Sequence, residues 1–133
     1  MIAIRRAILM AAGVCAAVLC GAAGSQNPPA HQELKRVDLP GAPGMEVISA
    51  LNEFKPGDEL PRHTHPGIES GYVLQGAMVQ VPGKEPFMLK AGAVIMNLRD
   101  VPHGGFKVVG DTSLKAYTVY VVDKDKPLYT WVK

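Results

Sequence analysis

Four side chains between residues 63 and 103 have the types and the spacing that metal chemistry needs. His63 and His65 stand two residues apart, so an extended strand would present both imidazoles on one face. Glu69 follows His65 across a Pro66-Gly67 turn that can return the chain to the same side, and His103 comes later in the chain. Three imidazoles and one carboxylate suit a divalent first-row cation such as Fe, Mn, Ni, Cu or Zn.

The elements that must position these side chains are predicted to be short strands. From residue 37 onward, apolar runs alternate with Gly and Pro punctuation, and no window has a clean helical period. The expected strands cover residues 46–54, 71–75, 77–81, 87–89, 93–97, 106–109 and 114–122, with a last one within 128–132. Short strands at this spacing indicate an all-β sandwich or barrel.

The N-terminal segment has the three parts of a secretory signal peptide. Arg5 and Arg6 form a basic start, an apolar run from residue 7 to 23 follows, and small residues stand at 21–25. A transmembrane anchor is the alternative, which the Ala/Gly-rich composition disfavours. We therefore expect residues 1–24 to be a cleaved signal peptide, 25–36 a flexible leader and 37–133 one domain. The protein would be periplasmic or secreted and free of the membrane after cleavage.

Charge and cysteine content exclude several classes of function. The chain has 133 residues with 14 Lys and Arg against 12 Asp and Glu. Loss of residues 1–24 would remove two arginines and no acidic residue, which leaves 12 basic residues against 12 acidic residues. A neutral protein lacks the basic excess that nucleic-acid binding requires, so no nucleic-acid partner is expected. Both cysteines lie in residues 1–24, so the mature chain could form no disulfide, zinc finger or thiol nucleophile.

A longer pattern surrounds the first three candidate side chains. The sequence reads Gly57-x5-His63-x-His65-x3-Glu69-x6-Gly76. This resembles the first sequence motif of the cupin superfamily at every fixed position.

The second cupin motif is matched less completely. Gly92 and His103 stand at the required spacing, but Leu98 and Asp100 replace the usual Pro and Gly. Asp can adopt the left-handed backbone that Gly often provides in such a turn. A displaced turn would remove His103 from the site and leave three ligands.

The resemblance covers about residues 40–122 and is closest to small single-domain cupins. It implies an antiparallel jelly-roll barrel of six to eight strands with one metal in its mouth. Carried over residue by residue, the implied ligands are His63, His65, Glu69 and His103.

Other polar and apolar side chains have ordinary expected roles. His31 falls in the leader and is expected to be inert, and Arg62 and Arg99 flank the two motif segments. Either arginine could receive an anionic substrate, although solvated surface charge is the usual role of turn arginines. Core packing is the expected role of Met78, Met88, Met96, Tyr72, Phe106, Tyr117 and Tyr120.

Three functions are compatible with such a centre. A redox-active metal would favour a small-molecule oxidoreductase of dioxygenase type, with Glu69 as the catalytic base, as the resemblance to quercetin dioxygenase-like cupins implies. Mn or Zn would favour an isomerase or lyase. The third is a non-catalytic module that binds a small ligand. The expected partner is therefore a small molecule, and pairing of sheet edges would make the protein a homodimer.

Overall fold

The computed structural model describes residue 28 and residues 30–133, and within this part the chain forms strands and no helix. The predicted signal peptide and residues 25–27 and 29 of the predicted leader lie outside the described residues. No helix in the described part has the length and hydrophobicity that crossing a bilayer requires. The strands are β1 (His31–Asp38), β2 (Met45–Phe54), β3 (Glu59–Leu60), β4 (His63–Thr64), β5 (Gly67–Gln75), β6 (Ala77–Gln80), β7 (Phe87–Leu89), β8 (Val94–Asn97), β9 (Phe106–Val109), β10 (Leu114–Asp123) and β11 (Thr130–Trp131).

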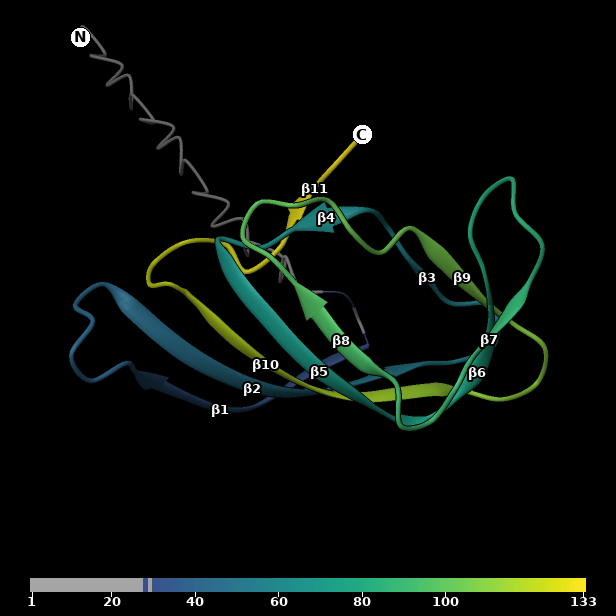
Figure 1. The fold of residues 1–133 in the computed structure, drawn as a ribbon, viewed down its shortest axis with the longest axis horizontal. Coiled ribbons are helices and arrows are strands. Elements are labelled where there is room, and N and C mark those ends of the chain that lie inside the picture. Colours follow the sequence, from purple (N-terminus) through teal and green to yellow (C-terminus); the bar gives the residue numbers. More distant parts are fainter. Residues whose placement is uncertain (1–27, 29) are drawn as a thin grey trace, which may run out of the picture.

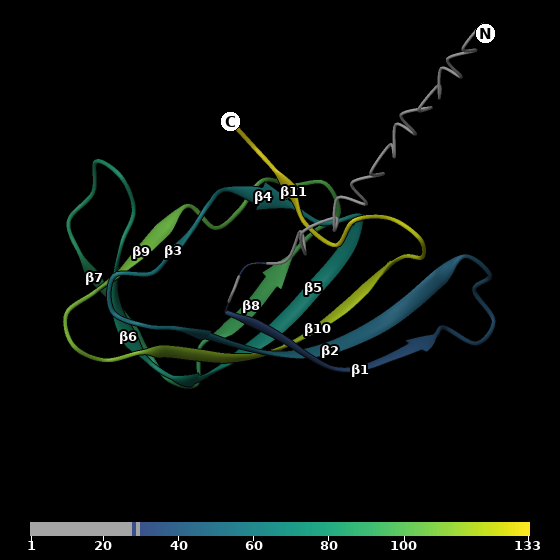
Figure 2. The ribbon, with the colours of Figure 1, turned by 180° about the vertical axis from the view of Figure 1, so that it is seen from behind.

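The strands form three antiparallel sheets that wrap around one interior (Figures 1 and 2). The long sheet has the order β1-β2-β10-β5-β8, the short sheet has the order β3-β9-β6-β7, and β11 pairs with β4. Strands distant in sequence are neighbours, because β10 lies between β2 and β5. The predicted all-β antiparallel fold is confirmed, and the predicted strands agree closely with β2 and β6 to β11. β5 begins at Gly67, four residues before the predicted start, so Glu69 lies within the strand.

Side-chain alternation along the long strands places one face inside. In β2 and β10 every second residue is buried, as expected for strands with one covered face. Two apolar clusters fill the interior. One consists of Ile48, Ala50, Tyr120, Val122, Leu128 and Tyr129. The other consists of Phe54, Val73, Ala77, Val79, Val108 and Leu114. The same long strands thus supply both clusters, one beside the candidate site and one away from it.

The first strand differs from the sequence prediction, which assigned residues 25–36 to a flexible leader. The structure pairs β1 with β2 from His31 opposite Asn52 to Asp38 opposite Glu46. Most β1 side chains are exposed, so the strand carries no apolar alternation that a sequence pattern could reveal. Its stability comes from the backbone ladder at the sheet edge and from ion pairs of Arg36.

Several side chains expected in the core lie outside it. Strand alternation says which residues share a face and not which face is inward. Exposed side chains of this kind are Tyr72, Met88, Met96 and Tyr117. Met88 and Met96 belong to β7 and β8, which end their sheets, so their outward faces have no neighbouring layer. The expectation was correct for Tyr120, which is fully buried.

Two inward-facing glycines let β5 and β10 approach closely. A Cβ atom at Gly67 would collide with the backbone oxygen of Val121, and one at Gly71 would lie 2.9 Å from the Thr118 methyl group. Gly67 and Gly71 share the buried face of β5 with Glu69 and Val73. A side chain at either position would therefore push β5 away from β10 on both sides of Glu69.

Candidate metal centre

Backbone pairing brings His63 and His103 together. The amide of His63 donates to the carbonyl of His103 at 3.0 Å, and the amide of His103 donates back at 2.9 Å. Residues directly opposite in an antiparallel pair have adjacent side chains. Their ring centroids are accordingly 4.3 Å apart.

The turn that delivers His103 has the backbone expected from the sequence. Asp100 adopts a left-handed conformation with φ of 59°, and its amide donates to the carbonyl of His65 at 3.0 Å. The replacement of Gly by Asp in the second motif is thus accommodated without displacing the turn, as predicted.

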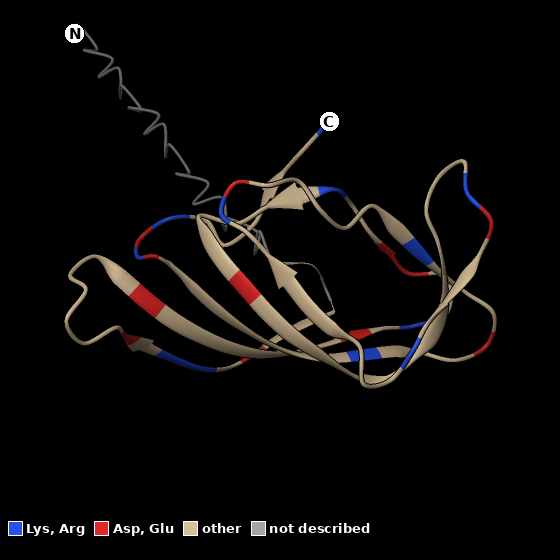
Figure 3. Cartoon of the chain, in the orientation of Figure 1, with Lys and Arg blue, Asp and Glu red and all other residues tan. Residues whose placement is uncertain are grey.

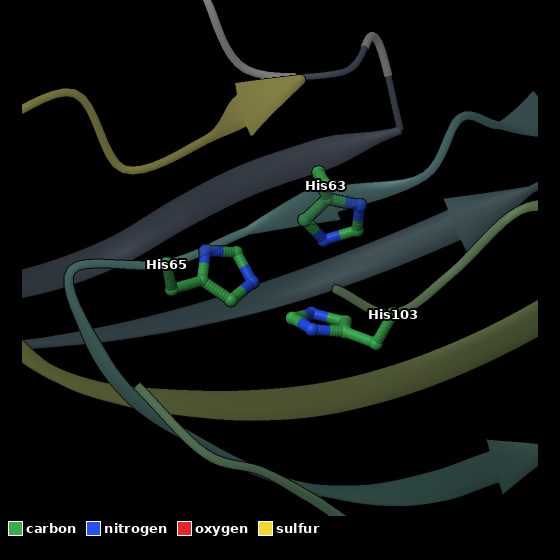
Figure 4. Close-up of side chains that lie close together, drawn as sticks. All are labelled: His63, His65 and His103. Atoms are coloured by element: carbon green, nitrogen blue, oxygen red, sulfur yellow. The ribbon is translucent and has the colours of Figure 1, made fainter. Parts of the chain in front are cut away.

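The structure brings all four candidate side chains to one place. The ligand atoms of His63, His65 and His103 lie within 4.8 Å of one another, and their rings face a common space (Figure 4). Glu69 contacts two of these imidazoles: its Oε2 is 3.5 Å from Nε2 of His65 and 3.3 Å from Nε2 of His103. His63, His65 and Glu69 are buried, and His103 is half-buried.

Hydrogen bonds to backbone carbonyls fix the tautomer of each imidazole. Nδ1 of His63, His65 and His103 lies 2.9, 2.6 and 2.9 Å from the carbonyl oxygens of Pro61, Leu128 and Val101 respectively. A carbonyl only accepts, so each Nδ1 carries the proton and each neutral ring keeps its Nε2 lone pair free.

Two of these lone pairs have no hydrogen-bond partner. Nε2 of His65 and Nε2 of His103 are buried without a hydrogen bond, and each faces Oε2 of Glu69, at 3.5 and 3.3 Å. A lone pair opposite a carboxylate is costly unless a proton or a cation lies between them. A metal ion accepts such lone pairs, and carbonyl-anchored imidazoles are the usual support of metal ligands. The donor set therefore fits a divalent transition metal.

The electrostatics of the site favour a bound cation. Burial lowers the pKa of His63 to about 4, so this ring is neutral near pH 7. Burial alone would raise the pKa of Glu69, but the facing imidazoles and the Asn97 amide hold it well below the usual range. Burial opposes protonation of His103, but the Glu69 carboxylate outweighs it and raises the pKa of His103. The site thus holds a buried carboxylate that needs positive charge beside it.

Asn97 is a member of the site that sequence reasoning missed. Its Nδ2 donates to Oε2 of Glu69 at 2.6 Å. Asn97 lies directly opposite Glu69 in the β5–β8 pairing, and this register is visible only once the sheet is assembled. The amide orients the carboxylate and holds it ionised.

Replacing Asn97 by alanine is expected to weaken metal binding by about tenfold to a hundredfold, because outer partners of metal ligands contribute on that scale. Competition with a chromophoric chelator measures the affinity, and circular dichroism checks the fold. Asn97→Leu is the matched variant: it keeps nearly the same size and loses the donated hydrogen bond without adding a charge. An unchanged affinity in both variants would contradict the role of Asn97.

His31 is also misplaced by the sequence analysis, which put it in an inert leader. On β1 its Nδ1 lies 3.1 Å from Oδ1 of Asn52 and 3.3 Å from the hydroxyl of Tyr129. The Tyr129 hydroxyl in turn lies 3.1 Å from that of Tyr120. His31 Nε2 is buried without a partner as well, but this ring is not part of the imidazole group. A polar network therefore runs from β1 towards the site.

The C-terminal segment closes one side of the centre. The Tyr129 ring lies 4.9 Å from that of His63 and 4.8 Å from that of His65. Trp131 stacks on Tyr129 at 5.4 Å and lies 5.6 Å from His63. Burial raises the pKa of Tyr129 and that of Tyr120, so both hydroxyls stay protonated at neutral pH.

Comparison with known proteins agrees with this architecture. A family model described as "Cupin domain" matches residues 50–120. No curated protein matches the sequence significantly.

Two solved structures share the fold at low sequence identity. An uncharacterized conserved protein with a double-stranded β-helix domain from Klebsiella pneumoniae subsp. pneumoniae MGH 78578 has a TM-score of 0.57 and 16% identity, over 82% of this chain and 88% of that one. The DMSP lyase DddQ from Ruegeria pomeroyi DSS-3 has a TM-score of 0.52 and 17% identity, over 82% of this chain and 57% of that one. At these identities the likeness is one of fold.

Proposed function

Because the chain belongs to the cupin-domain family, we propose that it binds one divalent first-row transition metal and uses it on a small molecule. The proposed ligands are His63, His65, Glu69 and His103. The observation that carries this proposal is the pair of buried, unpartnered Nε2 atoms of His65 and His103, both directed at the Glu69 carboxylate.

The activity that we propose is that of a small-molecule oxidoreductase of dioxygenase type. A redox-active metal, when bound, supplies the electron exchange with O2 that such a reaction needs. Glu69 would act as the base, because it is the carboxylate that lies against His65 and His103. These contacts hold its pKa low, and burial would raise that pKa once Glu69 leaves its imidazole partners, so that it could keep a substrate proton. Asn97 would hold this carboxylate in place, and the burial of His63 and His65 would keep water away.

The test begins with the metal content of the protein, purified without a His-tag or chelators because added imidazoles compete for metal. We expect near-stoichiometric metal by elemental analysis. After loading with Fe, Cu or Ni, we expect O2 uptake with diol, enol or flavonol substrates. If the purified protein retains no Fe, Mn, Ni, Cu or Zn and cannot be loaded with any of them, the proposed metal site is wrong.

The alternatives from the sequence use the same residues and are separated by the same experiment. Turnover of hydroxy-ketones or uronates by the Mn or Zn form without O2 uptake would identify an isomerase or lyase. Ligand-dependent thermal shifts without turnover of any bound compound would identify a binding module. Either result would replace the dioxygenase proposal and leave the metal site intact.

Export and pairing of chains are two further proposals. The sequence pattern of residues 1–24 supports export to the periplasm or medium. For a homodimer, the support is the edge strand β8, on which Val94 and Met96 are 73% and 59% exposed. Apolar side chains on an unpaired strand edge favour pairing with a second copy.

A further inference from the structure

A cavity of about 810 Å³ lies beside the candidate metal centre. Its walls come from β3 and residues 61–62, from the end of β6 and the loop after it, and from residues 102–107. His103 is the one proposed ligand that lines it. The volume is in the range of small-molecule sites, and the shared imidazole links the cavity to the metal centre.

The cavity wall carries an excess of positive charge. Its charged lining residues are Arg62, Lys84, Lys107 and Glu59. Lys107 is neutralised by Glu59 at 3.2 Å, whereas Arg62 and Lys84 have no ion-pair partner among residues 30–133. Figure 3 shows basic positions on β9, on the loop after β6 and just before β4, and acidic positions on β3 and on the loop after β6. Two cations therefore remain available to an anionic ligand.

The Arg62 side chain is supported by a glycine. A Cβ atom at Gly105 would lie 3.6 Å from Cγ of Arg62, so the aliphatic part of this side chain packs over the Gly105 backbone. Gly105 has φ of +74°, which other residues rarely adopt. Arg62 is exposed, and this packing places its aliphatic stem at the cavity wall.

Arg99, the other arginine that flanks the motifs, is already satisfied. Its two terminal nitrogens donate to the two carboxylate oxygens of Asp123 at 2.9 and 2.8 Å. It does not line the cavity. The structure thus separates the two arginines that the sequence left equivalent, and Arg62 is the one placed to receive an anion.

We propose that this cavity binds a small carboxylate with an apolar body, its carboxylate on Arg62 and Lys84 and its body against Phe106 and the His103 ring. The planar guanidinium matches a carboxylate through two parallel hydrogen bonds. The rest of the lining is largely apolar and includes Leu60, Val81, Pro82 and Pro102. The inference deepens the proposed function by naming its substrate class, and it rests on that function for the role of His103.

Benzoate is the probe for this proposal, with benzamide as its neutral counterpart of equal shape. Calorimetric titration of the full chain, with and without metal, is expected to show saturable benzoate binding at millimolar concentration and at least tenfold weaker benzamide binding. Arg62→Ala is expected to weaken benzoate binding about tenfold, since one charge-assisted hydrogen bond contributes on that scale. Lys84→Ala is expected to act in the same direction.

Arg99→Ala is the matched control, because it removes an arginine outside the cavity. Equal effects of Arg62→Ala and Arg99→Ala, or equal binding of benzoate and benzamide, would overturn the proposal. Binding of inorganic phosphate but not benzoate would also overturn it, in favour of a phosphate ligand. Arg62→Lys keeps the charge and should retain part of the affinity, which separates a charge effect from misfolding.

The two proposals fail in different ways. Arg62-dependent benzoate binding by a protein that takes up no metal would reject the proposed function and support the carboxylate cavity. Metal uptake without benzoate binding would reject the cavity proposal alone. A shift in the visible spectrum of the Co(II)-loaded protein on benzoate addition would support contact through His103.

Discussion

Replacing His65 by alanine is expected to lower the affinity for a divalent first-row metal by at least about a hundredfold while the barrel remains folded. Loss of an outer partner alone weakens metal binding by about tenfold to a hundredfold, and His65 is a proposed direct ligand. Its Nε2 is one of the two buried, unpaired nitrogens of the site. The His65 ring is fully buried against Tyr120 and Tyr129, so its loss should lower the stability of the protein. The barrel should still fold, because the strand pairing of the long sheet does not involve this side chain.

His31→Ala is the matched control for this experiment. This variant removes another imidazole of the interior, that of the half-buried His31. His31 does not belong to the group formed by His63, His65 and His103. We expect it to retain metal within about tenfold of the original affinity, because it acts at most through Tyr129. Chelator competition gives both affinities, and circular dichroism gives the fold. Equal losses in the two variants would refute the assignment of His65 as a ligand.

Replacing Gly67 by alanine is expected to destabilise the protein by about 3 kcal/mol or more, at the upper end of overpacking effects. The new methyl group would meet the backbone oxygen of Val121, which the β5–β10 ladder holds in place. A flexible side chain could move aside, but a paired backbone cannot do so without breaking its hydrogen bonds. The strands would have to separate at the point where Glu69 enters the site.

Gly83→Ala provides the comparison for Gly67→Ala. Gly83 lies in the loop after β6 with φ of +75°, and nothing lies within 4 Å of its Cβ position. Its replacement should cost only the backbone strain of a left-handed residue, about 1 kcal/mol. Urea denaturation measures both free energies of unfolding. Similar values for the two variants would show that β5 and β10 can adjust to a side chain.

Much of the fold could be predicted from the sequence, because its long strands have one buried face. The sequence marks β2 and β10 as long, mostly apolar runs between turns with Gly or Pro, and the structure adds the regular alternation of buried and exposed positions along them. β1 carries mostly exposed side chains, and β3 and β4 have two residues each, so none of them leaves a hydrophobic pattern. Their strand structure comes from pairing with partners that the local sequence does not reveal.

The candidate site was predictable where local spacing determines geometry. Two residues along a strand return a side chain to the same face, which places His63 near His65. The outer members could not be found in this way, because Asn97 reaches Glu69 through the β5–β8 register and Tyr129 arrives from the C-terminal segment. Sequence spacing carries no information about such contacts between distant segments.

The position of Trp131 should make metal binding at the candidate centre detectable by intrinsic fluorescence. It is the one tryptophan of the chain, and its ring lies 5.6 Å from that of His63. A paramagnetic ion such as Cu(II), if held by His63, would quench the indole emission strongly, whereas the closed-shell ion Zn(II) would not. Intrinsic fluorescence of the untagged protein can therefore follow metal uptake in real time and distinguish two classes of ion without a label.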